Sequence, residues 1–377
     1  MKKNSTSNAA RPKQKRPATS KKTTAKTTAK QTIGIDLGDQ NSAYCVLDAE
    51  GDILSEGTVR TSESGFAQQF QGASTCRIAI ETGTHSPWVS RLLQSYGHEV
   101  IVANARQVRV IYESDRKNDK VDARMLARLA RIDKDLLHPI RHRSEKAQAD
   151  LTMLRARDAL VQVRTKLINC ARGLVKSVGG RLPGASGEYF AKKVREHIPA
   201  ALCDALTPVL DQIEQLSTQL RDYDKRIEQM AKTDYAPTKL MRQIPGVGAI
   251  TSLAFTLTIE DPHRFGKSRD IAGYLGLLPR QGDSGESKPQ LSITKAGDRM
   301  VRSLLVGCAH YILGHFGPDS DLRRWGLSLM VRGGKNAKKR AVVAVARKLA
   351  VLMHKLWVTG EVYEPLREAN RIKAVAA

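Results

Sequence analysis

The sequence predicts a mixed α/β unit followed by two mainly helical segments. Between residues 32 and 132, short runs of β-branched and apolar residues alternate with amphipathic stretches, which is typical of strands and helices in one sheet-based unit. From residue 144 onward, apolar residues recur at helical spacing over long stretches instead. The predicted parts are a basic arm at 1–31, an α/β unit at 32–140, a helical middle at 141–237, a helical unit at 238–360 and a tail at 361–377.

The charge of the chain predicts a polyanionic partner. Its 377 residues hold 62 Lys and Arg against 38 Asp and Glu, a net charge of +24. Residues 1–31 hold eight Lys, two Arg and no acid, so the rest of the chain still carries 24 − 10 = +14. Such a surplus favours nucleic acid ahead of an anionic membrane. Because aromatic residues make up only 5% of the chain, we expect the basic surface to contact phosphates more than to stack on bases.

Composition also bears on compartment and order. The arm 1–31 is low in complexity and predicted to be disordered, either as an electrostatic tether to nucleic acid or as a solubilising tail. No apolar run reaches the roughly 18–20 residues that span a membrane, and no secretory signal follows the basic N-terminus, which predicts a cytoplasmic, nucleoid-associated protein without a membrane partner. The five cysteines lack metal-ligand spacing and are predicted to be reduced and buried.

The elements of the α/β unit follow from alternation and turn signals. They come in the order three strands, helix, strand, helix, strand, helix, which is the ribonuclease-H-like arrangement of a mixed sheet flanked by helices. In that arrangement the first and fourth strands are neighbours. The predicted strands are 33–37, 43–47, 53–59, 76–81 and 98–103, and the predicted helices are 65–71, 84–96, 105–112 and 119–132.

Four carboxylates in this unit are candidates for one site. Asp36 lies in an apolar strand, Glu81 ends the fourth strand, and Asp119 and Asp122 open the last helix on one face. Like charges held close together repel unless cations neutralise them, so convergence predicts a site for two Mg²⁺ ions, with Mn²⁺ as an alternative. Such a pair of metals activates a nucleophile and stabilises a leaving oxygen at a phosphodiester. Each acid also has an ordinary interpretation, such as a surface carboxylate or a helix N-terminal charge.

The helical middle is predicted to contain two long helices. The first spans 144–178 and the second begins at Thr207-Pro208, with Pro237 ending the segment. Apolar residues of the second helix repeat at alternating spacings of four and three, which predicts a coiled coil. The stripe could pair within the chain or form a dimer seam, and the sequence leaves both open. It consists of Val209, Ile213, Leu216, Leu220, Tyr223, Ile227 and Met230.

The sequence near the start of the last unit resembles a helix–hairpin–helix turn. In the segment 244–250, Gly246 and Gly248 allow the backbone to approach a phosphate, and the next helix N-terminus can bind it. A tight turn between two packed helices is the alternative. Further helices are predicted at 268–274, 298–313, 322–331 and 341–357, and the basic loop 332–340 is predicted to face nucleic acid or solvent.

A serine in this unit is a candidate nucleophile. Ser284 is flanked by glycines, and nearby cations could hold a phosphate and disperse the charge of a transition state. A serine in such a loop is otherwise an ordinary turn residue. The cations are Arg280, Lys288, Lys295 and Arg299.

Several motifs, taken in order, resemble the DEDD-type insertion-sequence transposases, which are relatives of pilin-gene invertases and of bridge-RNA-guided recombinases. The resemblance covers residues 32–357. The motifs are IGIDLG, AIETG, KNDKVDARMLA, RQIPGVGAITS and GYLGLLPRQGDSGESK.

The resemblance implies a RuvC-like domain whose four acids, at the positions named above, hold Mg²⁺, and a nucleophilic Ser284 that joins DNA through a phosphoserine link. It also implies a prokaryotic mobile element with DNA ends and target as substrates, a structured non-coding RNA as guide, and homodimers or tetramers assembled through the helical middle. One departure is visible: Glu286 follows Gly285 where many relatives have a second glycine, which makes Ser287 a rival nucleophile.

Three other interpretations remain open from the residues. A ribonuclease-H-like nuclease or junction resolvase would use water as nucleophile, with Ser284 as a loop residue. An actin- or hexokinase-like ATPase is disfavoured because the C-terminal half has no second GxDxG-type strand and no adenine-site glycines. The third is a nucleic-acid-binding protein without catalysis.

Overall fold

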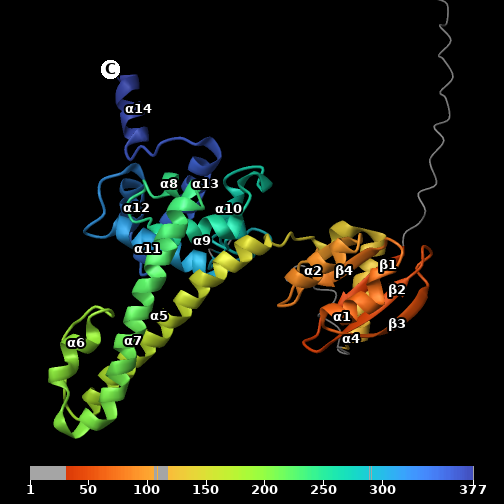
Figure 1. Ribbon diagram of the computed structural model, residues 1–377. Helices are drawn as coiled ribbons and strands as arrows, with labels where there is room; N and C mark the ends of the chain where they lie inside the picture. Colours follow the sequence, from red (N-terminus) through yellow and green to blue (C-terminus); the bar gives the residue numbers. More distant parts are fainter. Residues whose placement is uncertain (1–30, 106–107, 109–117, 288, 290, 377) are drawn as a thin grey trace, which may run out of the picture. The chain divides into compact units, whose positions relative to one another are not determined.

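The computed structural model describes residues 31–105, 108, 118–287, 289 and 291–376, and it divides at His142 and Arg143 into two compact units (Figure 1). Unit 1 ends at His142 and unit 2 begins at Arg143. The predicted basic arm, most of the helix predicted at 105–112 and the candidate Lys288 lie outside the described residues.

Unit 1 is built on one five-stranded sheet with the order β3-β2-β1-β4-β5. β1 pairs antiparallel with β2 and parallel with β4; β2–β3 is antiparallel and β4–β5 is parallel. The five predicted strands and the prediction that the first and fourth strands are neighbours are therefore confirmed. The strands are β1 Thr32–Asp36, β2 Asn41–Leu47, β3 Ile53–Arg60, β4 Arg77–Glu81 and β5 Glu99–Ala103.

Helices cover both faces of this sheet (Figure 1). On one face, α1 (Glu63–Phe66), its π-helical continuation (Ala67–Gln71) and α2 (Ser86–Ser95) pack on the isoleucines of β1 and β4. On the other face, α4 (Asp119–Ile132) packs on small residues of β2 and β4. A 3₁₀ turn at Lys134–Leu137 follows α4. The central strands β1 and β4 are thus buried on both faces, as their apolar residues predict, whereas the edge strand β3 is largely exposed.

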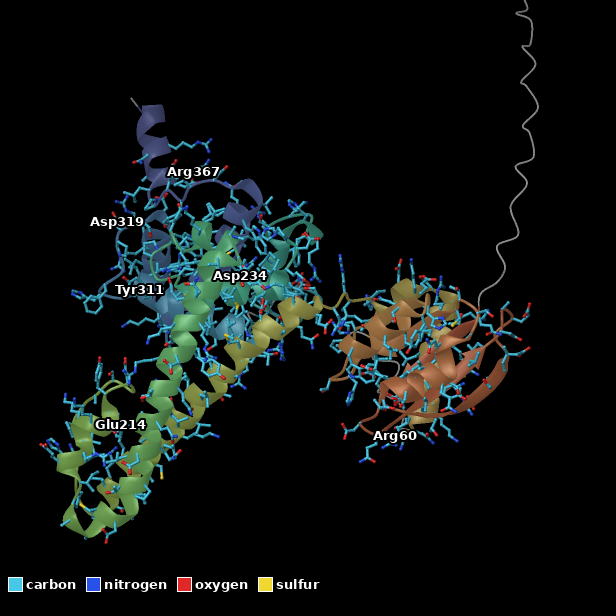
Figure 2. The ribbon with its side chains drawn as sticks, viewed as in Figure 1. Arg60, Glu214, Asp234, Tyr311, Asp319 and Arg367 are labelled. Carbon is cyan, nitrogen blue, oxygen red and sulfur yellow. The ribbon has the colours of Figure 1, made fainter. Side chains whose placement is uncertain are left out.

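Unit 2 begins with an arm made of α5 (Glu145–Ser177) and α7 (Cys203–Thr233), which pack side by side in opposite directions (Figure 1). The short helix α6 (Phe190–Val194) lies at the far end of this arm, between 3₁₀ turns at Arg195–His197 and Ala200–Leu202 and the end of α5. In Figure 2, Glu214 lies out along the arm and Asp234 lies where α7 reaches the body of the unit. Within one chain, the buried residues of α7 therefore pack against α5 and α6.

The predicted start of the second long helix is wrong. α7 begins at Cys203, and Pro208 lies inside the helix, so Thr207 is not its N-cap. The Thr207 hydroxyl donates to the Cys203 carbonyl instead, at 2.7 Å. Leu206 is fully buried against α6. Burying a leucine side chain is worth about 1.5–3 kcal/mol, which helps offset the hydrogen bond that proline cannot make.

The body of unit 2 is a helical cluster around one large core. Its central helix α9 is buried from Thr251 to Ile259. The helices are α8 Pro237–Met241, α9 Ala249–Ile259, α10 Asp270–Tyr274, α11 Arg299–Leu313, α12 Asp321–Val331, α13 Ala337–Thr359 and α14 Arg367–Ala376, with a 3₁₀ turn at Pro262–Arg264.

Two local predictions in this body are corrected. Ser268 does not cap α10, because the N-cap of that helix is Arg269. The Ser268 hydroxyl lies 3.0 Å from His354 Nδ1 instead. The basic loop predicted at 332–340 ends at residue 336, because Ala337 and Ala341 bury against the body and begin α13. Packing of small apolar residues thus draws basic neighbours into a helix.

The five cysteines are all free thiols, but only three are buried. Cys170 and Cys203 are exposed on the arm, so the prediction that all five are buried is wrong for this pair. Among the helices of the described residues, none combines the length and apolar character that crossing a membrane requires.

Candidate active site

Two of the candidate carboxylates end neighbouring strands. Asp36 is the last residue of β1 and Glu81 the last residue of β4. The parallel register pairs Ile35 with Ile80, so the next residue of each strand lies at the same end of the sheet. Both residues are half-buried. We call this end of the sheet, with Asp36, Glu81, Asp119 and Asp122, the carboxylate edge.

The direction of α4 turns its N-terminus toward this edge. Arg77, at the start of β4, donates to the carbonyl of Ala130 near the C-terminus of α4, at 3.1 Å. Arg131 donates to the carbonyl of Ala49, in the hairpin between β2 and β3, at 3.2 Å. The C-terminus of α4 therefore lies where β1 and β4 begin. Its first turn, which carries Asp119 and Asp122, faces the ends of those strands.

A glycine fixes how closely α4 approaches β1. A Cβ on Gly34 would lie 2.0 Å from the carbonyl oxygen of Ala123 and 2.4 Å from the amide nitrogen of Ala127. Asp36 lies two residues after Gly34, on the same face of the strand. Asp122 directly precedes Ala123 and is only 6% exposed. This backbone contact places the buried Asp122 on the side of β1 that carries Asp36.

The donor set suits a hard divalent cation, because such ions prefer carboxylate oxygens. Even so, in the part of the chain that the structure describes, no three Asp, Glu, His or Cys side chains form a group able to hold a metal. Asp36, Glu81 and Asp122 each have a polar or electrostatic interaction already. The four acids therefore share one edge, and their convergence on a pair of metal ions stays a prediction.

An ion pair away from the edge also ties α4 to the sheet. The guanidinium of Arg124 binds both carboxylate oxygens of Glu56, on β3. This contact, with a smaller opposing effect of burial, lowers the pKa of Glu56 below its usual range. Burial and the neighbouring Glu56 raise the pKa of the Cys45 thiol to about 11, so this cysteine is a neutral core residue.

Sequence reasoning missed two residues at the carboxylate edge. His85 Nε2 lies 3.3 Å from Asp39 Oδ1, joining the loops that follow β4 and β1. Trp88 Nε1 donates to His85 Nδ1 at 3.1 Å, and since indole N–H only donates, the proton of a neutral His85 sits on Nε2 and points to Asp39. The pairing of two loop residues 46 positions apart leaves no periodic signal in the sequence.

The candidate serine lies at the tip of a hairpin-like segment, which we call the serine loop. Its described residues are 276–287, 289 and 291–295. Its sides are joined by Thr294 N–H to Leu278 O at 2.8 Å and by Arg280 N–H to Ser292 O at 2.9 Å. Ser284 and Ser287 exchange backbone hydrogen bonds of 3.1 and 3.0 Å, closing a two-residue turn. Gly285 has φ +55° at the first position of that turn, where a positive φ is required.

The base of the serine loop is packed and its tip is exposed. Arg302 donates to the carbonyls of Leu275 and Ala296, at 2.9 and 2.8 Å, which joins both sides of the base to α11. Ser284 is exposed, as are the predicted phosphate-binding side chains Arg280, Lys295 and Arg299. The loop therefore presents a hydroxyl and several cations to solvent from a fixed base.

The helix–hairpin–helix turn has a packing role at one of its two glycines. Gly246 has φ +89°, and a Cβ there would lie 2.7 Å from the ring of Tyr311, which is labelled in Figure 2. Gly248 precedes α9 in an extended conformation, with nothing within 4 Å of an added Cβ. The backbone conformation of the turn and the contact with Tyr311 thus explain why glycine is needed at position 246. At Gly248 neither reason applies, and the space beside it is open.

Comparisons with known proteins cover both units. Residues 33–179 match the DEDD transposase model of the IS110 type, and residues 238–323 match the model described as the IS116/IS110/IS902 transposase family. The first match contains Asp36, Glu81, Asp119 and Asp122, and the second contains Ser284.

Individual relatives agree with these models. A putative transposase (y4pF/y4sB) of Sinorhizobium fredii is 31% identical over 76% of this chain and 74% of its own length. The transposase for insertion sequence element IS1111A of Coxiella burnetii is 29% identical over 88% and 90%. A pilin gene-inverting protein of Moraxella bovis is 25% identical over 86% and 95%. The chain therefore belongs to the IS116/IS110/IS902 family of insertion-sequence transposases, and it is a DNA-recombining enzyme.

Proposed function

We propose that this transposase cuts and rejoins DNA through a covalent phosphoserine intermediate on Ser284, with the carboxylate edge as its metal-binding half. The observation that carries the proposal is the placement of Asp36 and Glu81 at the ends of two adjacent parallel strands, at the edge that the first turn of α4 faces. Carboxylate oxygens gathered at one edge favour divalent cations as neutralising partners.

The fold supports this assignment. Three antiparallel-linked strands, two parallel strands and flanking helices suit a ribonuclease-H-like, RuvC-like domain in residues 32–140. We assign 141–237 to a helical coiled-coil segment, 238–360 to the transposase domain that carries the serine loop, and the ends 1–31 and 361–377 to a basic arm and a tail.

The serine step is a transesterification. The Oγ of Ser284 attacks the phosphorus and its proton passes to water. The P–O bond to one sugar oxygen breaks and that oxygen takes a proton from water, which leaves a free sugar hydroxyl and DNA esterified to the protein. Rejoining is the reverse reaction with a different sugar hydroxyl, which restores the serine. Arg280, Lys295 and Arg299 are exposed around the loop and suited to hold the phosphate, with Lys288 as a further cation.

The acids have the complementary role. Asp36, Glu81, Asp119 and Asp122 would hold two Mg²⁺ or Mn²⁺ ions. When bound, these cations stabilise the negative charge that develops on the attacked phosphate and the leaving oxygen. A scaffold of buried strands and a packed helix holds these acids in place.

We further propose a structured non-coding RNA as guide and assembly as dimers or tetramers. The charge of +14 outside residues 1–31 is sufficient to accommodate two nucleic acids. On the arm, the side chains of Val163 and Leu174 are exposed, at 46% and 45%, which suits an intermolecular seam.

The test is covalency. The full chain is incubated with labelled DNA spanning the junction of its own element, Mg²⁺ and the flanking non-coding RNA, and then denatured. We expect a protein–DNA adduct that disappears in Ser284→Ala and persists in Ser287→Ala, the matched control across the same turn. Guide binding is tested separately, by sequencing the RNA that co-purifies with the chain.

Two outcomes would contradict the proposal. An adduct that survives Ser284→Ala but is lost in Ser287→Ala moves the nucleophile across the turn. Cleavage without any adduct, abolished by Asp36→Ala but not by Ser284→Ala, identifies a water-using nuclease or junction resolvase instead. Recovery of bulk cellular RNA alone would count against a guide.

A further inference from the structure

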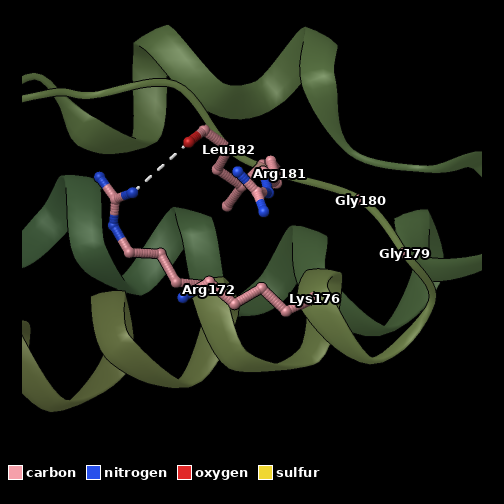
Figure 3. A pocket seen from close by; sticks show the side chains of 6 residues that line it. All are labelled: Arg172, Lys176, Gly179, Gly180, Arg181 and Leu182. Atoms are coloured by element: carbon pink, nitrogen blue, oxygen red, sulfur yellow. Dashed lines mark hydrogen bonds between the residues drawn. The ribbon is translucent and has the colours of Figure 1, made fainter.

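A basic pocket lies at the far end of the arm, where α5 ends and the chain turns toward α6. Its volume is about 600 Å³. Three of its six lining residues are cations and none is an acid. Figure 3 shows the residues that line it: Arg172, Lys176, Gly179, Gly180, Arg181 and Leu182.

Arg172 is held in place by neutral groups only. Its guanidinium donates to the carbonyl of Leu182 at 3.5 Å (Figure 3) and to that of Pro183 at 3.3 Å. It also lies 4.9 Å from the ring centroid of Phe190. A guanidinium has five N–H donors. Two of them are used here, so the other three have no acceptor among the residues described. Arg172 is therefore oriented in advance and keeps donors for a ligand.

The other two cations have no acidic partner in the described part of the chain. Some other cations on the arm do have acidic partners: Arg195 binds Asp211 at 2.7 Å and Arg157 binds Asp224. Lys176 lies in the last turn of α5, where the helix dipole favours a positive charge. That effect does not extend to Arg181, which follows the end of the helix. The positive charge of the pocket is thus larger than the local structure requires.

The shape and composition of the pocket select the ligand. Gly179 has φ +82° and nothing lies within 4 Å of an added Cβ, so one wall is bare backbone with open space beside it. No aromatic side chain lines the pocket, so bases have nothing to stack on. Cations with free N–H donors match the oxygens of a phosphate.

We propose that this arm-tip pocket binds phosphate groups of the DNA backbone, as a DNA contact separate from the carboxylate edge and the serine loop. DNA is favoured because the family recombines it, and a contact that reads only phosphates is independent of sequence. The inference depends on the family and not on the serine chemistry, so a Ser284→Ala chain keeps this contact.

The first test measures protection of Lys176. The full chain is acylated at low reagent concentration, alone and with a short duplex DNA of arbitrary sequence, and each lysine is quantified by mass spectrometry. We expect DNA to protect Lys176 severalfold more than Lys166, an exposed lysine without a described partner on the same helix. Inorganic phosphate, at an equal concentration of phosphate groups, is expected to protect neither.

Each other result overturns part or all of the proposal. Equal protection by inorganic phosphate would make the pocket a small-anion site. Protection by duplex RNA and not by DNA would exclude DNA as the ligand. Unchanged reactivity of Lys176 with every probe would show that nothing of this chemistry binds there.

The second test uses charge-matched variants. Lys176→Ala/Arg181→Ala removes one lysine and one arginine from the pocket, and Lys166→Ala/Arg226→Ala removes the same pair from other exposed positions of the arm. The slope of log K against log salt for duplex DNA should become less steep by about 1.8 in the pocket variant, because each phosphate contact contributes about 0.9. Equal slopes in the two variants would assign the effect to net charge and overturn the pocket.

Discussion

The carboxylate edge and the serine loop are positioned in opposite ways. At the edge, Asp36 and Glu81 end buried strands, and the buried Asp122 belongs to α4, the helix whose backbone approaches Gly34. At the loop, Ser284 is exposed on a two-residue turn, and only the base of the segment is fixed to α11. The acids are held by the packing of a whole domain. The position of the Ser284 hydroxyl, in contrast, is set by a turn that two backbone hydrogen bonds close.

This difference suits the two roles that we propose. A group that gathers like charges must resist their repulsion, and close-packed interiors provide that resistance. A nucleophile that attacks DNA, becomes esterified and is released must reach a large substrate, and exposed loops on a fixed base allow it. Substitutions should therefore have different effects in the two regions: at the edge they threaten both chemistry and fold, and at the loop only chemistry.

The largest expected effect is the loss of one edge carboxylate. Asp36→Asn should lower recombination by at least about 100-fold, the scale of losing one electrostatic contact to a transition state, while duplex DNA binding stays within about twofold. Asp39→Asn is the control, because Asp39 is at the same edge but its side chain is 93% exposed and pairs only with His85 among the contacts described. Equal losses of recombination activity in the two variants would contradict the prediction, because the activity would then depend on the charge at the edge and not on the position of Asp36.

Gly34 tests whether the edge depends on close packing. Gly34→Ala forces the backbone of α4 away from β1, since the added Cβ would lie 2.0 Å from Ala123 O. We expect unit 1 to lose about 1–3 kcal/mol of unfolding free energy, measured by denaturant titration, together with recombination activity. Gly72→Ala, where an added Cβ meets nothing within 4 Å, should change stability by less than about 0.5 kcal/mol. A stable, active Gly34→Ala chain would refute the close contact.

Much of the edge is predictable from sequence because it consists of regular elements. Alternation predicts the first strand at 33–37, within one residue of the observed ends of β1, and turn residues predict the hairpin at Gly51. Helix 119–132 is predicted with its observed bounds. The start of α7 is not predictable, because burial of Leu206 against α6 decides it. The pairing of Asp39 with His85 also depends on which strands are neighbours, and local patterns contain no information on it.

The smallest expected effect is that of a substitution in the serine loop, which should slow the chemistry without changing stability. Gly285 has φ +55°, a conformation that costs an ordinary L-residue about 1–2 kcal/mol and that asparagine tolerates better. Gly285→Ala should therefore slow adduct formation by about 5- to 30-fold, and Gly285→Asn by less, with no change in the thermal unfolding of either unit. Gly266→Ala is the control, since Gly266 is in the same unit and an added Cβ meets nothing within 4 Å. If Gly285→Ala and Gly285→Asn react as fast as the unsubstituted chain, the closed turn is not the conformation in which Ser284 attacks, because its strain would then have no kinetic effect.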